Sequence, residues 1–325
     1  LVKHVWNMKS ECRCSSNITT LCNLLVCILL DKSHHKELAV VYRQGCYIPL
    51  YLRTLLRIDN TIADLSRRCI SYTMQGLSFR EYLMFEGVAQ WDTISLEDIL
   101  TSHASIATKL TKDIHVLSHF VQYLQKGYYP FYWANKSTYL ARLHQVISTI
   151  IEVDIPQTES IEYATTYKAK QLLSTFASLV PYTLNISDLC KTIGITRNQL
   201  LRLLDMLERS ALLRKLYPEQ GNIQSLAKPE KILFENTNML YALSNEIEIG
   251  TLRETFFCNQ LSLHHELTMP QRGDVLVDGK YLFEIGGHNK NYKQISGITD
   301  SWIVADDIES GIGHKIPLWL FGMLY

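Results

Sequence analysis

Apolar residues recur every three to four positions between residues 96 and 180, which is typical of helices with one buried face. The first stripe predicts one continuous helix and consists of Ile106, Leu110, Ile114, Leu117, Val121 and Leu124. Gly127 and Pro130 are expected to end it. The stripe indicates a core-facing surface and no cofactor site.

Two further helices are predicted in the same region. The apolar residues of the second are Leu140, Leu143, Ile147, Ile150 and Ile151, before Pro156. Those of the third are Leu172, Leu173 and Phe176, before Pro181. An earlier helix is expected to follow Ser78, because Glu81 three residues later completes a capping box.

Residues 185–207 have the pattern of a helix-turn-helix. A short helix is expected to run to Ile193, Gly194 to make the turn, and Thr196 to cap a second helix. Extended segments at 212–217 and 231–234 would form a wing. Arg197, Asn198 and Arg202 would point outward, so this helix can enter a major groove. Winged helices also serve as protein-contact modules, and that alternative stays open.

The pattern after Gly250 changes to helix, strand, strand, helix, strand. A helix at 251–261 precedes two short apolar segments around a tight turn at 278–279. Residues 293–295 would open another helix, 301–305 a buried strand, and the apolar residues 316–325 would pack on this part. The hairpin would bring Asp274, early on its first strand, close to Glu284, late on its second.

Composition excludes a general attraction to nucleic acid. The 325 residues include 32 basic and 32 acidic side chains, so any nucleic-acid contact must come from a local patch. The most apolar run, 21–30, is too short to span a bilayer as a helix. No small-x-small cleavage site follows it. We therefore expect a cytoplasmic protein with no membrane partner.

Six of the eight cysteines lie in the first 69 residues. Cys12 and Cys14 with His34 and His35 would be the ligands of a metal site, but their spacing fits no common zinc pattern. Free thiols in a reducing cytosol are the favoured interpretation.

Segments 63–68, 72–83, 236–243 and 250–257 together resemble a prokaryotic family of AAA-type ATP-binding proteins. The ending at 316–322 is similar to a Bacteroides-type branch of it. In that family a P-loop ATPase with bound ATP and Mg²⁺ precedes a C-terminal domain that resembles restriction endonucleases. The resemblance covers about residues 58–325 and implies a bacterial protein.

Two features depart from the family. No G-x-x-x-x-G-K-[ST] loop is present, although backbone amides and the lysine of that loop hold the nucleotide phosphates. Arg67 and Arg68 match positions where the family presents arginines, which would act on a neighbour's γ-phosphate. Without a P-loop we expect the isolated chain not to hydrolyse ATP.

The resemblance implies a carboxylate site for Mg²⁺ at Asp274 and Glu284, with Glu254 as a further acid. Nucleases of this type usually place a lysine two residues after the glutamate, where this chain has Gly286. Lys290 or Lys280 would have to replace it, and Gln294 matches a position where relatives often have glutamine. Alternatively, Asp274 is only a turn residue and Glu284 binds backbone amides.

The predicted fold class is a multidomain α/β protein. Residues 1–57 are unassigned, 58–100 end an ATPase core, 101–180 form a helical lid, 181–235 a winged helix and 236–325 a restriction-endonuclease-like α/β domain. The favoured function is a regulatory module that binds DNA through the winged helix, a protein partner or a second copy, without ATPase activity. A Mg²⁺-dependent nuclease using Glu254, Asp274, Glu284 and Lys290 is the first alternative, and a non-functional truncated product is the second.

Overall fold

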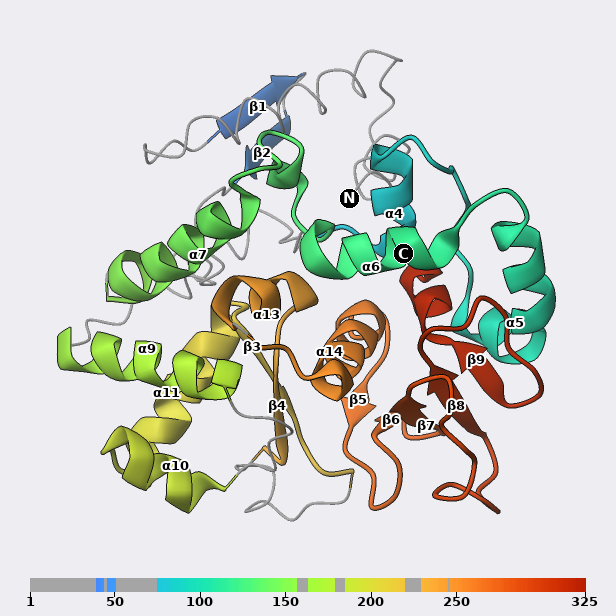
Figure 1. Ribbon diagram of the computed structural model, residues 1–325. Helices are drawn as coiled ribbons and strands as arrows, with labels where there is room; N and C mark the ends of the chain where they lie inside the picture. Colours follow the sequence, from blue (N-terminus) through green and yellow to red (C-terminus); the bar gives the residue numbers. More distant parts are fainter. Residues whose placement is uncertain are drawn as a thin grey trace.

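The computed structural model is a mixed α/β structure (Figure 1). It describes residues 39–43, 46–50, 75–156, 163–178, 185–219, 229–244 and 246–325. Arg67, Arg68 and the residues 12, 14, 34 and 35 of the first cysteine–histidine group lie outside these ranges. Strands β1 (Ala39–Arg43) and β2 (Cys46–Leu50), which the sequence analysis left unassigned, pair antiparallel with Val41 opposite Ile48.

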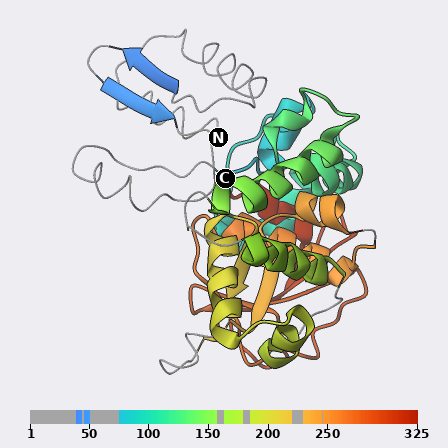
Figure 2. The same ribbon diagram turned by 90° about the vertical axis from the view of Figure 1, so that its left-hand side faces the viewer.

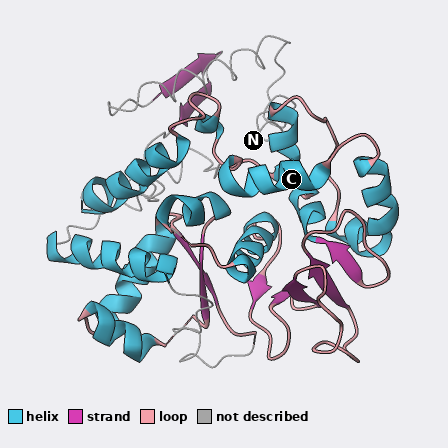
Figure 3. Cartoon of the chain, viewed as in Figure 1, coloured by secondary structure: helices cyan, strands magenta, loops and turns pink. Residues whose placement is uncertain are grey.

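Helices dominate the first large described range, as Figure 3 shows. They are α4 (Phe79–Phe85), α5 (Leu96–Thr111), α6 (Val116–Lys126), the 3-10 turn η1 (Pro130–Tyr132), α7 (Tyr139–Thr149), the π-helical turn η2 (Ile150–Asp154) and, after a gap, α9 (Tyr163–Ser178). The capping box of Ser78 and Glu81 at α4 is confirmed. The predicted second and third helices are confirmed as α7 and α9.

The prediction of one continuous helix through Val121 is wrong. The chain leaves helical structure after α5 and restarts at Val116, and Val121 is 52% exposed. The buried face of α6 uses aromatic residues instead, because the ring centroids of Phe120 and Tyr123 lie 5.2 and 5.5 Å from that of Phe79. Burial of these large rings against α4 therefore decides the direction of α6.

Two helices and a two-stranded sheet follow in the order predicted from residues 185–234. They are α10 (Ile186–Ile193), α11 (Arg197–Arg209), β3 (Leu213–Leu216) and β4 (Lys231–Phe234). Gly194 has a φ of 67°, a left-handed conformation that glycine adopts at little cost, and Thr196 caps α11. Strands β3 and β4 are antiparallel, with Leu216 opposite Lys231.

The C-terminal part is a five-stranded sheet with helix α14 packed on one face (Figure 1). Its elements are α13 (Thr237–Leu243), α14 (Ile249–Leu261), β5 (Leu267–Thr268), β6 (Val275–Val277), β7 (Tyr281–Gly286), β8 (Ser301–Ala305), β9 (Lys315–Pro317) and the 3-10 segment η3 (Leu318–Met323). The strand order is β5-β6-β7-β8-β9; the first three are antiparallel, and β8 and β9 continue parallel to β7.

The helix predicted at residues 293–295 is wrong. The segment forms consecutive turns, and Gly297 within it has a φ of 81°. Ile295 is nevertheless fully buried, in a small cluster with Leu276, Leu282 and Ile303 on the face of the sheet away from α14. Ile295 thus covers this face in place of a helix, together with the partly buried Tyr292, Ile298 and Ile308.

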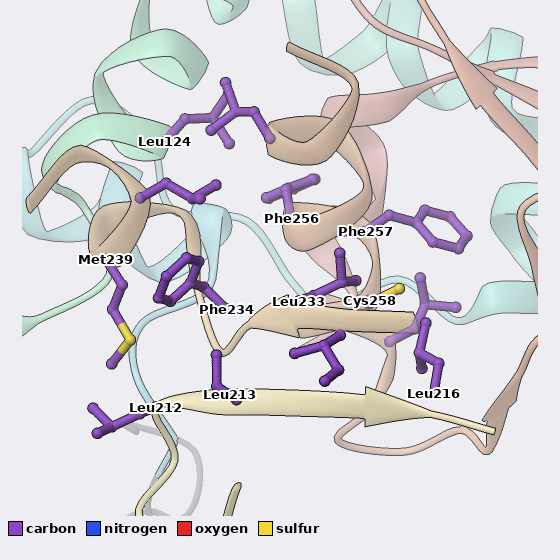
Figure 4. Packing of buried hydrophobic residues seen from close by; sticks show 14 of the residues in the cluster. Leu124, Leu212, Leu213, Leu216, Leu233, Phe234, Met239, Phe256, Phe257 and Cys258 are labelled. Carbon is purple, nitrogen blue, oxygen red and sulfur yellow. The ribbon is translucent and has the colours of Figure 1, made fainter. Parts of the chain in front are cut away.

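Contacts with several elements join the C-terminal part to the rest. The tail packs against α4, since Ser78 Oγ donates to the Tyr325 carbonyl oxygen at 2.6 Å. The end of β3 is hydrogen-bonded to the strand edge after β5, because Met269 N donates to Tyr217 O at 2.7 Å. Leu233 and Phe234 of β4 also pack toward Cys258, Phe256 and Phe257 of α14 (Figure 4).

The views in Figures 1 and 2 together show that α10 and α11 lie at one end of the described structure, with β3 and β4 between them and α14. Within the described residues, no helix is long and apolar enough to cross a membrane.

Candidate functional site

The hairpin of β6 and β7 places Asp274 opposite Glu284. Val275 pairs with Phe283 in the antiparallel hairpin. Asp274, which precedes Val275, therefore faces Glu284, which follows Phe283. Asp274 N donates to Phe283 O at 2.9 Å, and Asp274 Oδ2 accepts from Ile285 N at 2.6 Å. Asp278 and Gly279 have φ angles of 54° and 63°, as a tight hairpin turn requires.

Glu254 comes to the same place from α14. Burial raises the pKa of Glu254, and burial likewise raises the pKa of Glu284. The negative charge of Asp274 raises the pKa of both glutamates further, so all three acids lie within electrostatic range. Glu284 is only 2% exposed. Since carboxylates are seldom buried together without a function, this cluster is the strongest candidate site.

Lys290 supplies the cation that the sequence leaves out at position 286. Its Nζ forms an ion pair with Glu284 Oε1. A Cβ atom built at Gly286 would lie 2.7 Å from Lys290 Cδ and 2.8 Å from its Cγ. The stem of Lys290 therefore occupies the space that a side chain at 286 would fill. Lys280 is exposed at the hairpin turn and bonds Tyr281, and Gln294 is exposed in the following turns.

A second lysine, which the sequence analysis missed, completes the cluster. Lys231 at the start of β4 lies with its Nζ 2.6 Å from Glu254 Oε2. Its charge lowers the pKa of Glu254 and of Glu284, opposing the effect of burial. No local pattern marks this lysine, because it reaches the site only when β4 packs on α14.

The site offers hard oxygen ligands. Magnesium prefers carboxylate and carbonyl oxygens and needs only one or two protein carboxylates beside water. Within the described ranges, no three His, Cys, Asp or Glu side chains form a metal-binding group. Asp274 and Glu284 face each other, and each has one carboxylate oxygen outside the hydrogen bond or ion pair named above.

Helix α11 presents the other predicted residues. Arg197, Asn198 and Arg202 are all exposed, and the opposite face of the helix is buried through Leu200, Leu203, Leu204 and Leu207. The acids Asp205 and Glu208 of the same helix both form ion pairs with Lys215 of β3, which is 6% exposed. The single positive charge of Lys215 thus balances one of the two negative charges of these acids.

Comparisons with known proteins give no named activity. Residues 117–248, from α6 to the residue before α14, match a family described as a domain of unknown function (DUF8612). The chain is 25% identical over 258 residues to "Uncharacterized protein MJ1637" of Methanocaldococcus jannaschii, covering 71% of this chain and 54% of that protein. The chain thus spans about half the length of this curated relative. No solved structure matches.

Proposed function

We propose that the hairpin site is a divalent-metal-dependent site for cleaving phosphodiester bonds, formed by Asp274, Glu284 and Lys290. The observation that carries the proposal is the position of Lys290. It lies over Gly286 and pairs with Glu284. In this proposal the ammonium group of Lys290 takes the role of the lysine that restriction-endonuclease-like proteins have two residues after the glutamate.

The order of elements supports this proposal. A helix bearing Glu254 precedes three antiparallel strands, and a further strand is added parallel to the third. This order agrees with the predicted helix, hairpin and later strand, except that consecutive turns stand where a helix was predicted between the hairpin and that strand. Asp274 and Glu284 would hold the metal, which when bound polarises a phosphoryl oxygen and activates water. Lys290 would donate hydrogen bonds to a phosphate oxygen or the attacking water.

The test exchanges the two lysine positions. Wild-type chain with Mg²⁺ or Mn²⁺ is expected to nick supercoiled DNA, and Glu284→Gln and Lys290→Ala are expected to lose at least about 100-fold in rate. The double change Gly286→Lys with Lys290→Ala should restore a substantial part, because it returns the ammonium to its usual position. Lys280→Ala is the matched control and should cleave normally.

Cleavage by Glu284→Gln at the wild-type rate would contradict the proposal, as would a wild type that neither binds Mn²⁺ nor cleaves. A wild type that binds Mn²⁺ and DNA without cleaving would instead favour the regulatory DNA- or protein-binding module of an AAA-type protein.

A second candidate function is nucleic-acid binding by α10, α11 and the β3–β4 sheet acting as a winged helix. The observation that favours it is the pairing of Lys215 with Asp205 and Glu208. This pairing halves the negative charge of the two carboxylates on the proposed recognition helix, which would otherwise repel phosphates more strongly. Arg197 and Arg202 would contact DNA, and Asn198 would read a base edge.

Salt dependence separates this function from a protein-contact role. The logarithm of the DNA association constant should fall with the logarithm of salt, and Arg197→Ala should reduce that slope by about 1. Lys191→Ala is the control, because it removes an exposed cation on the neighbouring helix α10, outside α11. An Arg197→Ala chain with unchanged slope and affinity would leave protein contact as the role of this face.

A further inference from the structure

The loop at residues 286–290 follows β7, and two basic side chains lie over its first two residues, both glycines. The stem of Lys290 occupies the space beside Gly286. The guanidinium of Arg253 on α14 lies over Gly287, because a Cβ atom built there would be 3.3 Å from Arg253 Nη2 and 3.5 Å from Nη1. The absence of side chains at both positions thus gives the two cations their room at the carboxyl end of β7.

Asp306, the residue after β8, fixes the orientation of Arg253. Arg253 Nε donates to Asp306 Oδ2 at 2.9 Å, and Asp306 Oδ1 accepts from Asp307 N at 2.8 Å. Asp306 N donates to Gly286 O at 2.8 Å, which ties this carboxylate to the loop. Within the described ranges Nη1 and Nη2 form no hydrogen bond, although the Arg253 side chain is only 19% exposed. The two terminal nitrogens therefore keep their donors for a ligand.

Lys315, at the start of β9, brings a third positive charge to the same loop. Its Nζ donates to the carbonyl oxygen of His288, and it forms no ion pair with any residue that the structure describes. The nearby acids are already engaged or hydrated. Glu248, on which the charge of Arg253 acts, accepts a backbone N–H at the start of α14, and Asp307 is 72% exposed. The charge of Lys315 is therefore available to a bound anion.

This geometry suits a phosphate group. A guanidinium that is fixed through its Nε presents its two terminal nitrogens as a fork, which matches two oxygens of one phosphate. Gly287 follows Glu284 by three residues, at most about 11 Å along the chain. An anion over Gly287 would therefore lie beside the carboxylates and not between them. Contacts to backbone phosphates next to the reacting one are how proteins hold nucleic acid in register.

We propose that Arg253 and Lys315, brought to adjacent residues of the loop after β7, bind a phosphodiester group of the nucleic-acid backbone beside the cleavage site. The inference rests on the proposed function and adds the part of the site that holds the substrate. Every contact comes from a side chain, so the binding needs no metal. Arg253 is a substrate-binding residue, and Asp306 is a positioning residue that acts through it.

The experiment follows the amide signal of Gly287 by NMR while the full chain, in EDTA, is titrated with dimethyl phosphate. This probe is a single phosphodiester without sugar or base. Among the 15 glycines of the sequence, Gly287 is the one that directly follows another glycine, so labelling glycine with ¹⁵N and with ¹³C at the carbonyl identifies its signal. Wild type should show a saturable shift of this signal.

The variants separate phosphate binding from a purely structural ion pair. Arg253→Gln should weaken binding of the probe at Gly287 by about tenfold or more. Arg253→Lys keeps a cation beside Asp306 but lacks the fork, so it should also weaken binding, and it keeps the test valid if Arg253→Gln does not fold. Lys315→Gln should weaken binding about threefold. Lys280→Gln, which changes an exposed lysine of the hairpin turn, is the control and should bind as wild type does.

A wild type without a saturable shift would overturn the inference, as would equal binding by wild type, Arg253→Gln and Arg253→Lys. Inorganic phosphate that binds about tenfold more tightly than dimethyl phosphate would mean a site for free phosphate or a monoester, and would overturn the assignment to a diester. DNA cleavage without a shift at Gly287 would remove this inference alone. A shift at Gly287 in a chain that does not cleave would support it and remove the nuclease.

Discussion

Two buried polar regions lie within a short distance of each other along the chain and differ in charge. In the first, the amide junction, the side chain of Asn238 joins helices α6, α7 and α13 through bonds to Tyr139, Tyr128, Tyr123 and Leu124. In the second, the carboxylate cluster, Glu254, Asp274 and Glu284 are held with Lys231 and Lys290. The junction is neutral and the cluster is charged.

The difference separates structural from functional residues. Neutral amides whose hydrogen bonds are satisfied stabilise a fold at any ordinary pH. Burial raises the pKa of Tyr139 well above its usual value, so the hydroxyl that bonds Asn238 stays neutral. Buried carboxylates cost free energy even when paired. Segment 236–243 carries part of the resemblance to ATP-binding proteins, and the junction gives this segment a structural role. The carboxylate cluster, by contrast, needs a function to account for its cost.

The largest expected effect is on the junction. Asn238→Leu should lower the free energy of unfolding by about 3–5 kcal/mol, because it leaves the Tyr128 amide and the carbonyl of Leu124 buried without partners. Urea unfolding of the full chain at pH 6 and pH 8 measures it, and the loss should be equal at both. The exposed Asn289→Leu should change stability by less than about 0.5 kcal/mol.

An equal and small loss in both asparagine variants would contradict the assignment of the junction as a structural joint. A loss that depends on pH would show that the junction contains a charge.

The carboxylate cluster should show the opposite behaviour. Burial raises the pKa of Glu284 in the folded chain, so the folded state holds this proton to higher pH than the unfolded state. Stability from this group is then fully present below the unfolded pKa and is lost as pH rises through the raised folded pKa. Glu284→Gln should therefore reduce the stability difference between pH 5 and pH 8.

Urea unfolding over this pH range is the measurement, with the exposed Glu266→Gln as the control. If Glu266→Gln changed the pH dependence as much as Glu284→Gln did, the burial of Glu284 would not explain it.

Local patterns predicted the elements better than the contacts between them. Capping residues and glycine conformations depend on a few neighbouring positions, so α4 with Ser78 and the turn at Gly194 were predictable. The direction of α6 depends on aromatic packing against α4, and the segment around Ile295 on covering one face of a sheet. Neither can be derived from periodicity alone.

The site shows the same limit. Asp274 and Glu284 belong to one hairpin, so their register follows from the turn. Lys290 was open as one of two lysines, and its ion pair with Glu284 and its position over Gly286 distinguish it from Lys280. Lys231 was missed because the sheet of β3 and β4 had to be packed on α14 before its side chain could meet Glu254.

The smallest expected effect on stability comes from Gly286→Ala. The new methyl group would overlap the stem of Lys290, but that stem is flexible and its side chain is 30% exposed, so it can move aside at a cost below about 1 kcal/mol. The displacement should weaken the ion pair with Glu284, and the pKa of Glu284 should rise further because Lys290 lowers it. Carbon-detected NMR titration of the glutamate carboxyl measures the pKa.

Gly322→Ala, whose methyl would lie 2.5 Å from Phe79 Cβ in the core, should instead destabilise the fold without moving this pKa. An unchanged pKa of Glu284 in Gly286→Ala would show that the ion pair between Lys290 and Glu284 does not require the absence of a side chain at position 286.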